Sequence, residues 1–300
     1  MTVLDGPALH VDHVSIAVRA IAPALEFLGR ILPIRMRIAP RPGYDGDFTW
    51  TDFFVGDFKL EFIESARPGS FVERFIARRG EGLHHLSIDV EENALDRYAA
   101  ALERAGLRIV DRGDYGNGAK TAFISPRTAP GILVQFWQVP GFHGGLPEGY
   151  PADPVVERDG VRFRVDHVAL AVRSIDATLG WFERVFPIEV SRPKQPGWDG
   201  THNVLGFRLA GYKMELIEPA NGGGFVARFL ARRGEGFHHL AIDVDRLDPL
   251  VARLETDGLA LVDQAEIRDG RKTAFIHPRD AHGVLIQFWQ EPEFGGPRRP

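Results

Sequence analysis

The segment FVERFIARRGEGLHHLSIDV at residues 71–90 returns as FVARFLARRGEGFHHLAIDV at residues 225–244, with 16 of 20 positions identical. A second match joins residues 120–138 to residues 272–290, at an offset of 152 instead of 154. Two long matches at nearly the same offset indicate a tandem duplication of a unit of roughly 150 residues. The sequence therefore predicts two similar domains.

We place the predicted domains at residues 8–140 and 161–292. The segment between them, residues 141–160, is rich in Gly and Pro and is predicted to be a linker. A weaker match inside each half, HVSIAV with HLSIDV, suggests that each domain contains two smaller units of roughly 70 residues.

A histidine opens each of four strand-like segments, and a Glu or Gln follows each one about 50 residues later. The four pairs are His13 with Glu61, His85 with Gln135, His167 with Glu215, and His239 with Gln287. Imidazole, carboxylate and carboxamide groups are the donors from which a transition-metal site is built. Their repetition at matched positions favours a metal site over chance.

The composition excludes several classes of protein. Hydrophobic residues make up 44% of the chain and charged residues 26%, which is typical of a soluble protein with a sizeable core. No apolar run is long enough to span a membrane, and the N-terminus lacks the pattern of a secretion signal. The absence of cysteine and the net charge of −5 favour a cytoplasmic protein that binds neither nucleic acid nor membrane.

The apolar pattern predicts the elements of the first half. Strands are expected at residues 11–18, 48–55, 59–63, 85–90, 108–111, 121–124 and 132–137, and helices at 22–32, 70–79 and 94–105. The order is that of a βαβββ unit written twice in each half.

A βαβββ repeat with these histidines resembles the vicinal oxygen chelate superfamily, and its motifs are most similar to those of methylmalonyl-CoA epimerases. The segments that carry the resemblance are DHVALAV, KMELIEP, GFHHLAIDV, KTAFIHP and GVLIQFWQ. The resemblance implies an α+β fold in which four βαβββ units pair into two domains with curved mixed sheets. It covers nearly the whole chain outside the linker and the tails.

The resemblance also implies two sets of metal ligands. They are His13, Glu61, His85 and Gln135 in the first half, and His167, Glu215, His239 and Gln287 in the second. The family usually has Glu at the last ligand position, where this chain has Gln, and here the carboxylate comes from the second ligand instead. The cofactor is expected to be a divalent transition metal (Mn, Fe, Co, Ni or Zn), with up to two ions per chain.

Two aspartates are candidates for the proton-transferring group. The glutamate that does this work in the epimerases lies about 16 residues before the second ligand, where this chain has Asp45 in GYDG and Asp199 in GWDG. If neither aspartate is the base, Glu64 and Glu218 beside the ligand strands are the next candidates. A Gly-rich turn is the competing interpretation of both aspartates.

Three functions remain open at this stage. The first is a metal-dependent isomerase, epimerase or lyase that acts through a metal-stabilised enolate of a small carbonyl or carboxylate substrate. The second is a non-haem Fe(II) dioxygenase of the same superfamily, since two His and one carboxylate also bind Fe(II). The third is a protein that sequesters a ligand without turnover. A monomer and a homodimer are both compatible with the duplication.

Overall fold

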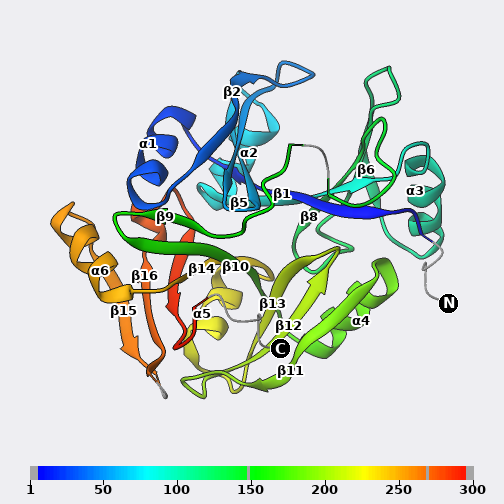
Figure 1. The fold of residues 1–300 in the computed structure, drawn as a ribbon. Helices are drawn as coiled ribbons and strands as arrows, with labels where there is room; N and C mark the ends of the chain where they lie inside the picture. The colour runs from blue at the N-terminus through cyan, green and yellow to red at the C-terminus, as the bar shows by residue number, and fades with distance from the viewer. Residues whose placement is uncertain (1–5, 147–148, 268–269, 295–300) are drawn as a thin grey trace.

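The structure is a computed structural model that describes residues 6–146, 149–267 and 270–294. It contains two curved mixed sheets, one built from each half of the chain (Figure 1). No helix in the described part of the chain is long and apolar enough to cross a membrane.

The first half follows the predicted order, with one strand more than predicted. Its elements are β1 (Leu9–Ala17), α1 (Ile21–Ile31), β2 (Arg35–Pro42), β3 (Phe48–Val55), β4 (Phe58–Ser65), α2 (Phe71–Arg79), β5 (Gly82–Val90), α3 (Leu95–Arg104), β6 (Ile109–Asp114), β7 (Lys120–Ile124) and β8 (Leu133–Gln138). The additional strand is β2, so the first unit is a complete βαβββ motif.

The second half repeats these elements. They are β9 (Val156–Arg158), β10 (Val161–Ala171), α4 (Ile175–Val185), β11 (Ile188–Pro196), β12 (His202–Leu209), β13 (Tyr212–Pro219), α5 (Gly224–Arg233), β14 (Gly236–Val244), α6 (Leu247–Thr256), β15 (Leu261–Glu266), β16 (Lys272–Ile276), η2 (Pro278–Asp280) and β17 (Leu285–Gln290). Strand β9 lies in the segment predicted as linker and pairs with β10; residues 147–148 of that segment lie outside the described residues.

Each sheet joins its two βαβββ units at the centre. The order of the first sheet is β2-β3-β4-β1-β5-β8-β7-β6, and the second sheet has the equivalent order β11-β12-β13-β10-β14-β17-β16-β15. The opening strands β1 and β5 pair antiparallel, while β4 is parallel to β1 and β8 is parallel to β5. The strands that carry the predicted ligands are therefore neighbours.

Local sequence sets the ends of the helices. The Ser70 hydroxyl accepts a hydrogen bond from Glu73 N at the start of α2, and Gly80 ends that helix with φ of 77°. In the same way, the Ser174 hydroxyl accepts from Ala177 N at the start of α4.

The main hydrophobic core extends through both halves, and each half adds a small cluster of its own. Helix α1 lies beside α6 of the other half (Figure 1), where Arg253 donates a hydrogen bond to Arg30 O at 3.0 Å. At the equivalent contact between α3 and α4, the Tyr98 hydroxyl donates to Val185 O at 2.8 Å. The halves are thus related by an internal pseudo-symmetry, which we infer from these matched contacts.

Two glycines allow the halves to approach closely. Gly131 has φ of 70°, and a Cβ there would lie 2.0 Å from Glu235 O. At the equivalent position Gly283 has φ of 78°, and a Cβ would lie 1.8 Å from Glu81 O. Any other residue at either position would strain its backbone and displace the opposite half.

Candidate metal centres

Neighbouring strands bring three of the predicted ligands of the first half together. Glu61 of β4 and His85 of β5 both stand opposite Ser15 of the central strand β1. His13 lies two residues earlier on β1, on the same face. The ligand atoms of the three side chains lie within 4.8 Å of one another, and all three residues are buried. His13 Nε2 lies 3.5 Å from Glu61 Oε1, and His85 Nε2 lies 3.9 Å from the same oxygen.

The second half repeats this cluster. Glu215 of β13 and His239 of β14 stand opposite Ala169 of β10, and His167 lies two residues earlier. His167 Nε2 lies 3.5 Å from Glu215 Oε1 and 3.2 Å from His239 Nε2. These three side chains also meet within 4.8 Å and are buried.

The two glutamines lie on the strand next to each cluster. Gln135 of β8 places Oε1 3.1 Å from His85 Nε2. Gln287 of β17 stands opposite Ala241, and its amide donates to Thr273 Oγ1 at 3.1 Å. The amide of Gln135 thus contacts a cluster histidine directly, whereas the amide of Gln287 donates to a residue of the neighbouring strand β16.

A β-bulge places an acid behind the first histidine of each cluster. The pairing of β1 with β5 is irregular at Asp12, and that of β10 with β14 is irregular at Asp166. A bulge breaks the alternation of faces, so an acid and the histidine after it can meet. Asp12 Oδ2 lies 2.5 Å from His13 Nδ1, and Asp166 Oδ2 lies 2.7 Å from His167 Nδ1. Each Nε2 is thereby directed at the cluster.

A lysine holds each of these acids in turn, and Lys59 of the first half is itself buried. Lys59 Nζ lies 2.7 Å from Asp12 Oδ2, and Lys213 makes the equivalent contact with Asp166. Burial raises the pKa of Asp12, but Lys59 and His13 outweigh it, so the pKa is held well below its usual range.

The charges in the clusters favour a bound cation. Burial raises the pKa of Glu61, but the adjacent His13 outweighs it and lowers the pKa. Burial alone would lower the pKa of His13, but the charge of Glu61 and the bond from Asp12 raise it to about 9. The second cluster behaves alike, and the pKa of His167 is raised to about 9. The lowered pKa of Glu61 keeps its carboxylate negatively charged, and the raised pKa of His13 means that its ring nitrogen favours a bound proton. The cluster therefore favours positive charge.

The residues fit a divalent ion. Among the described residues, His13 Nε2 is buried without a hydrogen-bond partner, although it points at Glu61 and His85. A buried nitrogen without a partner is costly unless a ligand satisfies it. Two imidazoles, one carboxylate and a nearby amide are donors that suit a first-row transition metal.

The first histidine of each HisHis pair, His84 or His238, lies outside its cluster. Strict alternation of side chains along a strand predicts that His84 and His238 face away from the site, toward the helix layer. The pairing of β1 with β5 is irregular at His84, and Nδ1 of His84 lies 2.8 Å from Nδ1 of His85. The His84 ring contacts Phe75 of α2 with ring centroids 4.6 Å apart, and His238 contacts Phe229 of α5 in the same way at 4.9 Å.

The two candidate bases lie in the turns before β3 and β12. Asp45 is exposed, and its carboxylate accepts a hydrogen bond from Asp47 N. Asp199 accepts from Thr201 N at 2.9 Å, and its Oδ1 lies 2.7 Å from His202 Nδ1. Neither aspartate belongs to the clusters of possible metal ligands found among the described residues.

The structure adds His202 to the candidate residues and gives Glu64 and Glu218 other contacts. The ring of His202 is buried against Phe225, and the equivalent position in the first half is Phe48. Sequence reasoning missed His202 because it is not repeated, although that difference between the halves was a signal. Glu64 and Glu218 accept hydrogen bonds from the backbone at the starts of α1 and α4, which suits helix capping better than catalysis.

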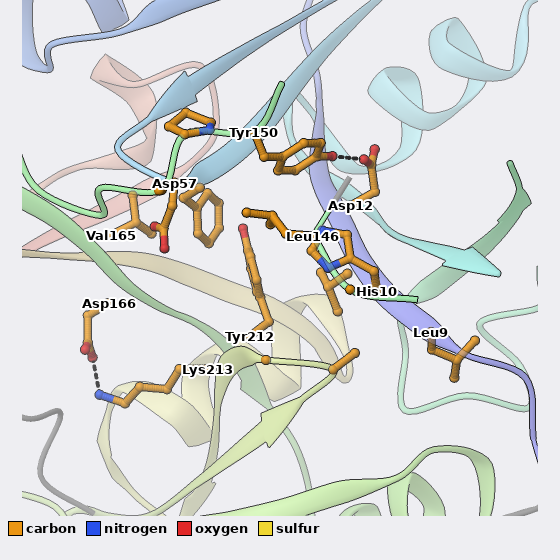
Figure 2. Close-up of a pocket in the computed structure, with 17 residues that line it drawn as sticks. Leu9, His10, Asp12, Asp57, Leu146, Tyr150, Val165, Asp166, Tyr212 and Lys213 are labelled. Atoms are coloured by element: carbon orange, nitrogen blue, oxygen red, sulfur yellow. Dashed lines mark hydrogen bonds and ion pairs between the residues drawn. The ribbon is translucent and has the colours of Figure 1, made fainter. Parts of the chain in front are cut away.

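A cavity of about 340 Å³ lies between the two halves and is lined by residues of both (Figure 2). Asp12 and Asp166 line it from opposite sides (Figure 2). The Tyr150 hydroxyl donates to Asp12 within it, and Tyr212 stands against Phe58 with ring centroids 4.4 Å apart. The acids that orient the two first histidines therefore border one shared cavity.

Comparisons with known proteins agree with this arrangement. The model of the Glyoxalase/Bleomycin resistance protein/Dioxygenase superfamily matches residues 12–124 and again residues 166–276. The mitochondrial methylmalonyl-CoA epimerase of Bos taurus is 31% identical over 130 residues, which cover 42% of this chain and 74% of that protein. The ethylmalonyl-CoA/methylmalonyl-CoA epimerase of Cereibacter sphaeroides is 28% identical over 131 residues, 42% of this chain and 97% of its own.

Among solved structures, a mutant of 4-hydroxymandelate synthase from Streptomyces coelicolor matches both halves together. It covers 97% of this chain and 94% of its own, with a TM-score of 0.67 and 20% sequence identity, and so shows the shared fold. The family model matches twice, in line with the duplication, and the matched segments contain His13 and Glu61 with His85, and His167 and Glu215 with His239. The chain belongs to the glyoxalase/bleomycin resistance protein/dioxygenase superfamily, with one copy of the family unit in each half.

Proposed function

We propose that this chain is a divalent-metal-dependent isomerase, epimerase or lyase with a site in each half. The observation that carries the proposal is the meeting of two histidines and a glutamate within 4.8 Å, once in each sheet. The curated relatives that are epimerases of acyl-CoA esters support a reaction that moves a proton next to a carbonyl.

In this proposal His13, Glu61 and His85 hold one ion and His167, Glu215 and His239 the other, with Gln135 and Gln287 as the amide donors. The bound ion would polarise a substrate carbonyl and so favour loss of the adjacent proton to give an enolate. Asp12 and Asp166 would fix the orientation of the first histidine in each set. Burial of the clusters would exclude bulk water from the reacting atoms.

Proton transfer is assigned to Asp45 or Asp199, and the contacts favour Asp199. Its carboxylate lies 2.7 Å from His202 Nδ1, so the pair can share a proton and present either form to a substrate. Asp45 is exposed and has Phe48 at the position equivalent to His202. The second half is therefore the better candidate for the proton-transfer site.

A non-haem Fe(II) dioxygenase is the second candidate function. The observation that favours it is the ligand set itself, because two histidines and one carboxylate form the set that Fe(II) uses to activate O₂. The two candidates differ in whether turnover consumes O₂.

The test follows solvent deuterium and O₂ in one experiment. The full chain is loaded with Mn²⁺, Co²⁺ or Fe²⁺ in separate samples and given methylmalonyl-CoA, then a 2-oxo acid, in D₂O. Deuterium at the carbon next to the carbonyl without O₂ uptake is the expected result. Uptake of O₂ linked to product with Fe²⁺ would replace this function with the dioxygenase. Equal exchange by a His13→Ala/His167→Ala double variant would contradict a role for the clusters.

A further inference from the structure

The two halves differ in a row of three residues that stand opposite one another on neighbouring strands and end at the ligand glutamate. In the first sheet the row is Ile38, Asp52 and Glu61 on β2, β3 and β4. In the second sheet it is Arg192, Gly206 and Glu215 on β11, β12 and β13, in the same register. Two of the three positions have changed chemistry between the halves.

In the first half the row contains its own second carboxylate. Asp52 is buried at 1% exposure, and its Oδ2 lies 2.7 Å from Arg37 Nη1 and 3.3 Å from Lys59 Nζ. Arg37 thus engages Asp52 and leaves Glu61 to the histidines. Both basic groups on this side of the first cluster, Arg37 and Lys59, therefore contact a carboxylate that is not a predicted metal ligand.

In the second half Gly206 replaces that acid and an arginine reaches the cluster. Arg192 Nη2 donates to Glu215 Oε2, while Oε1 of the same carboxylate faces His167. Burial raises the pKa of Glu215, but His167 and Arg192 together outweigh it and hold the pKa far below its usual range. Since Asp52 offsets Arg37 and no acid stands at position 206, the second cluster is more positive by one charge.

Two hydrogen-bonding atoms beside Gly206 have no protein acceptor or donor. Among the described residues, Arg192 Nε and Ser191 Oγ are buried without a hydrogen-bond partner. Both belong to groups next to Gly206: a Cβ there would lie 3.3 Å from Ser191 Oγ and 3.3 Å from Arg192 Cβ. Buried donors of this kind are rare unless a ligand or water satisfies them. The Arg192 side chain is 31% exposed, so a small molecule can approach it.

We propose that the second half carries an anion subsite, formed by Arg192 and Ser191 beside Gly206, that binds a carboxylate of the substrate where the first half places Asp52. The subsite selects a substrate with a negatively charged group next to the part that reaches the ligand cluster. The first half, which supplies Asp52 itself, does not bind such a substrate in the same way. This inference rests on the proposed function for the role of the cluster.

The experiment measures binding of malonate and of its uncharged diamide, malonamide, to the full chain by calorimetry, with and without added Mn²⁺. We expect one malonate per chain. Arg192→Met should raise its Kd about tenfold or more, because a charged hydrogen bond is lost. Gly206→Asp should do the same, since it installs the first-half acid against Arg192. The matched control in the first half, Ile38→Met, should leave the Kd of malonate within a factor of two of wild type. Arg192→Met should not change the binding of malonamide.

The outcomes separate this inference from the proposed function. Elemental analysis of each sample measures metal content independently of malonate binding. An absence of metal would therefore contradict only the metal-dependent function. Three results would each overturn the anion subsite. They are two equivalent malonate sites per chain, no malonate binding with or without Mn²⁺, and equal Kd values for wild type, Arg192→Met and Gly206→Asp. Circular dichroism of each variant checks that it is folded.

Discussion

Asp166 Oδ2 lies 2.7 Å from Nδ1 of His167, so the other ring nitrogen of this histidine faces Glu215 and His239. The bulge that permits this contact is present in both halves. An acid in this position orients the imidazole and raises its strength as a metal ligand.

Asp166→Asn should therefore weaken metal binding in the second half by roughly 10- to 100-fold without removing a ligand. Competition with a coloured chelator measures the affinity of each site. Asp176→Asn is the matched control, because Asp176 is an exposed acid in an ion pair with Lys194. Unchanged affinity in Asp166→Asn would mean that the acid does not tune His167.

Asp199→Asn should lower the rate of deuterium exchange by roughly 10²- to 10⁴-fold while metal content stays at the wild-type level. Replacing the carboxylate removes the acceptor for the proton, while the amide oxygen of Asn can still accept a hydrogen bond from His202 Nδ1. Asp45→Asn is the comparison in the first half. A loss confined to Asp45→Asn would move the proton-transfer site to the first half.

His202→Phe copies the first half, where Phe48 occupies the equivalent position. If Asp199 and His202 share the proton, this variant should lower kcat and shift the pH profile of the reaction. A variant with an unchanged pH profile would give His202 a packing role against Phe225.

A buried acid makes the stability of the first half depend on pH. Burial and the charge of Asp12 raise the pKa of Asp89 from 3.8 to about 8. The folded state thus holds this proton more tightly than the unfolded state. Asp89 consequently destabilises the fold increasingly as pH rises from about 4 to about 8.

Asp89→Asn should remove this penalty and raise Tm at pH 8.5 by about 2–4 °C, with little change at pH 4. Asp243→Asn is the comparison, because Asp243 is the equivalent of Asp89 in the second half. Asp243 stands opposite Arg164 and forms an ion pair with it, whereas Asp89 stands opposite His10. Differential scanning calorimetry at both pH values makes the comparison. An Asp89→Asn variant with a lower Tm at pH 8.5 would contradict the assigned cause.

The sequence predicted the ligand strands because each contains several apolar residues that are buried. Leu60 and Phe62 alternate with Glu61, and all three are buried since the sheet is covered on both faces at this point. Strand β2 was not predicted, because seven of its eight residues are exposed and its polar–apolar alternation covers only residues 35–38 before two prolines.

Side-chain geometry was the part that sequence patterns could not supply. The bulges at Asp12 and Asp166 break the rule of alternating faces, and nothing in the residue types marks them in advance. The contact of Arg192 with Glu215 depends on the register of β11 with β12 and β13, which is fixed only when the sheet is complete.

The central claim is that each half binds one divalent ion through two histidines and a glutamate. Elemental analysis of the purified full chain after Mn²⁺ loading and gel filtration tests it most directly. We expect two ions per chain in the wild type, one in His13→Ala, one in His167→Ala and none in the double variant. The claim would be contradicted if the wild type bound no metal, or if these substitutions left the number of ions per chain unchanged.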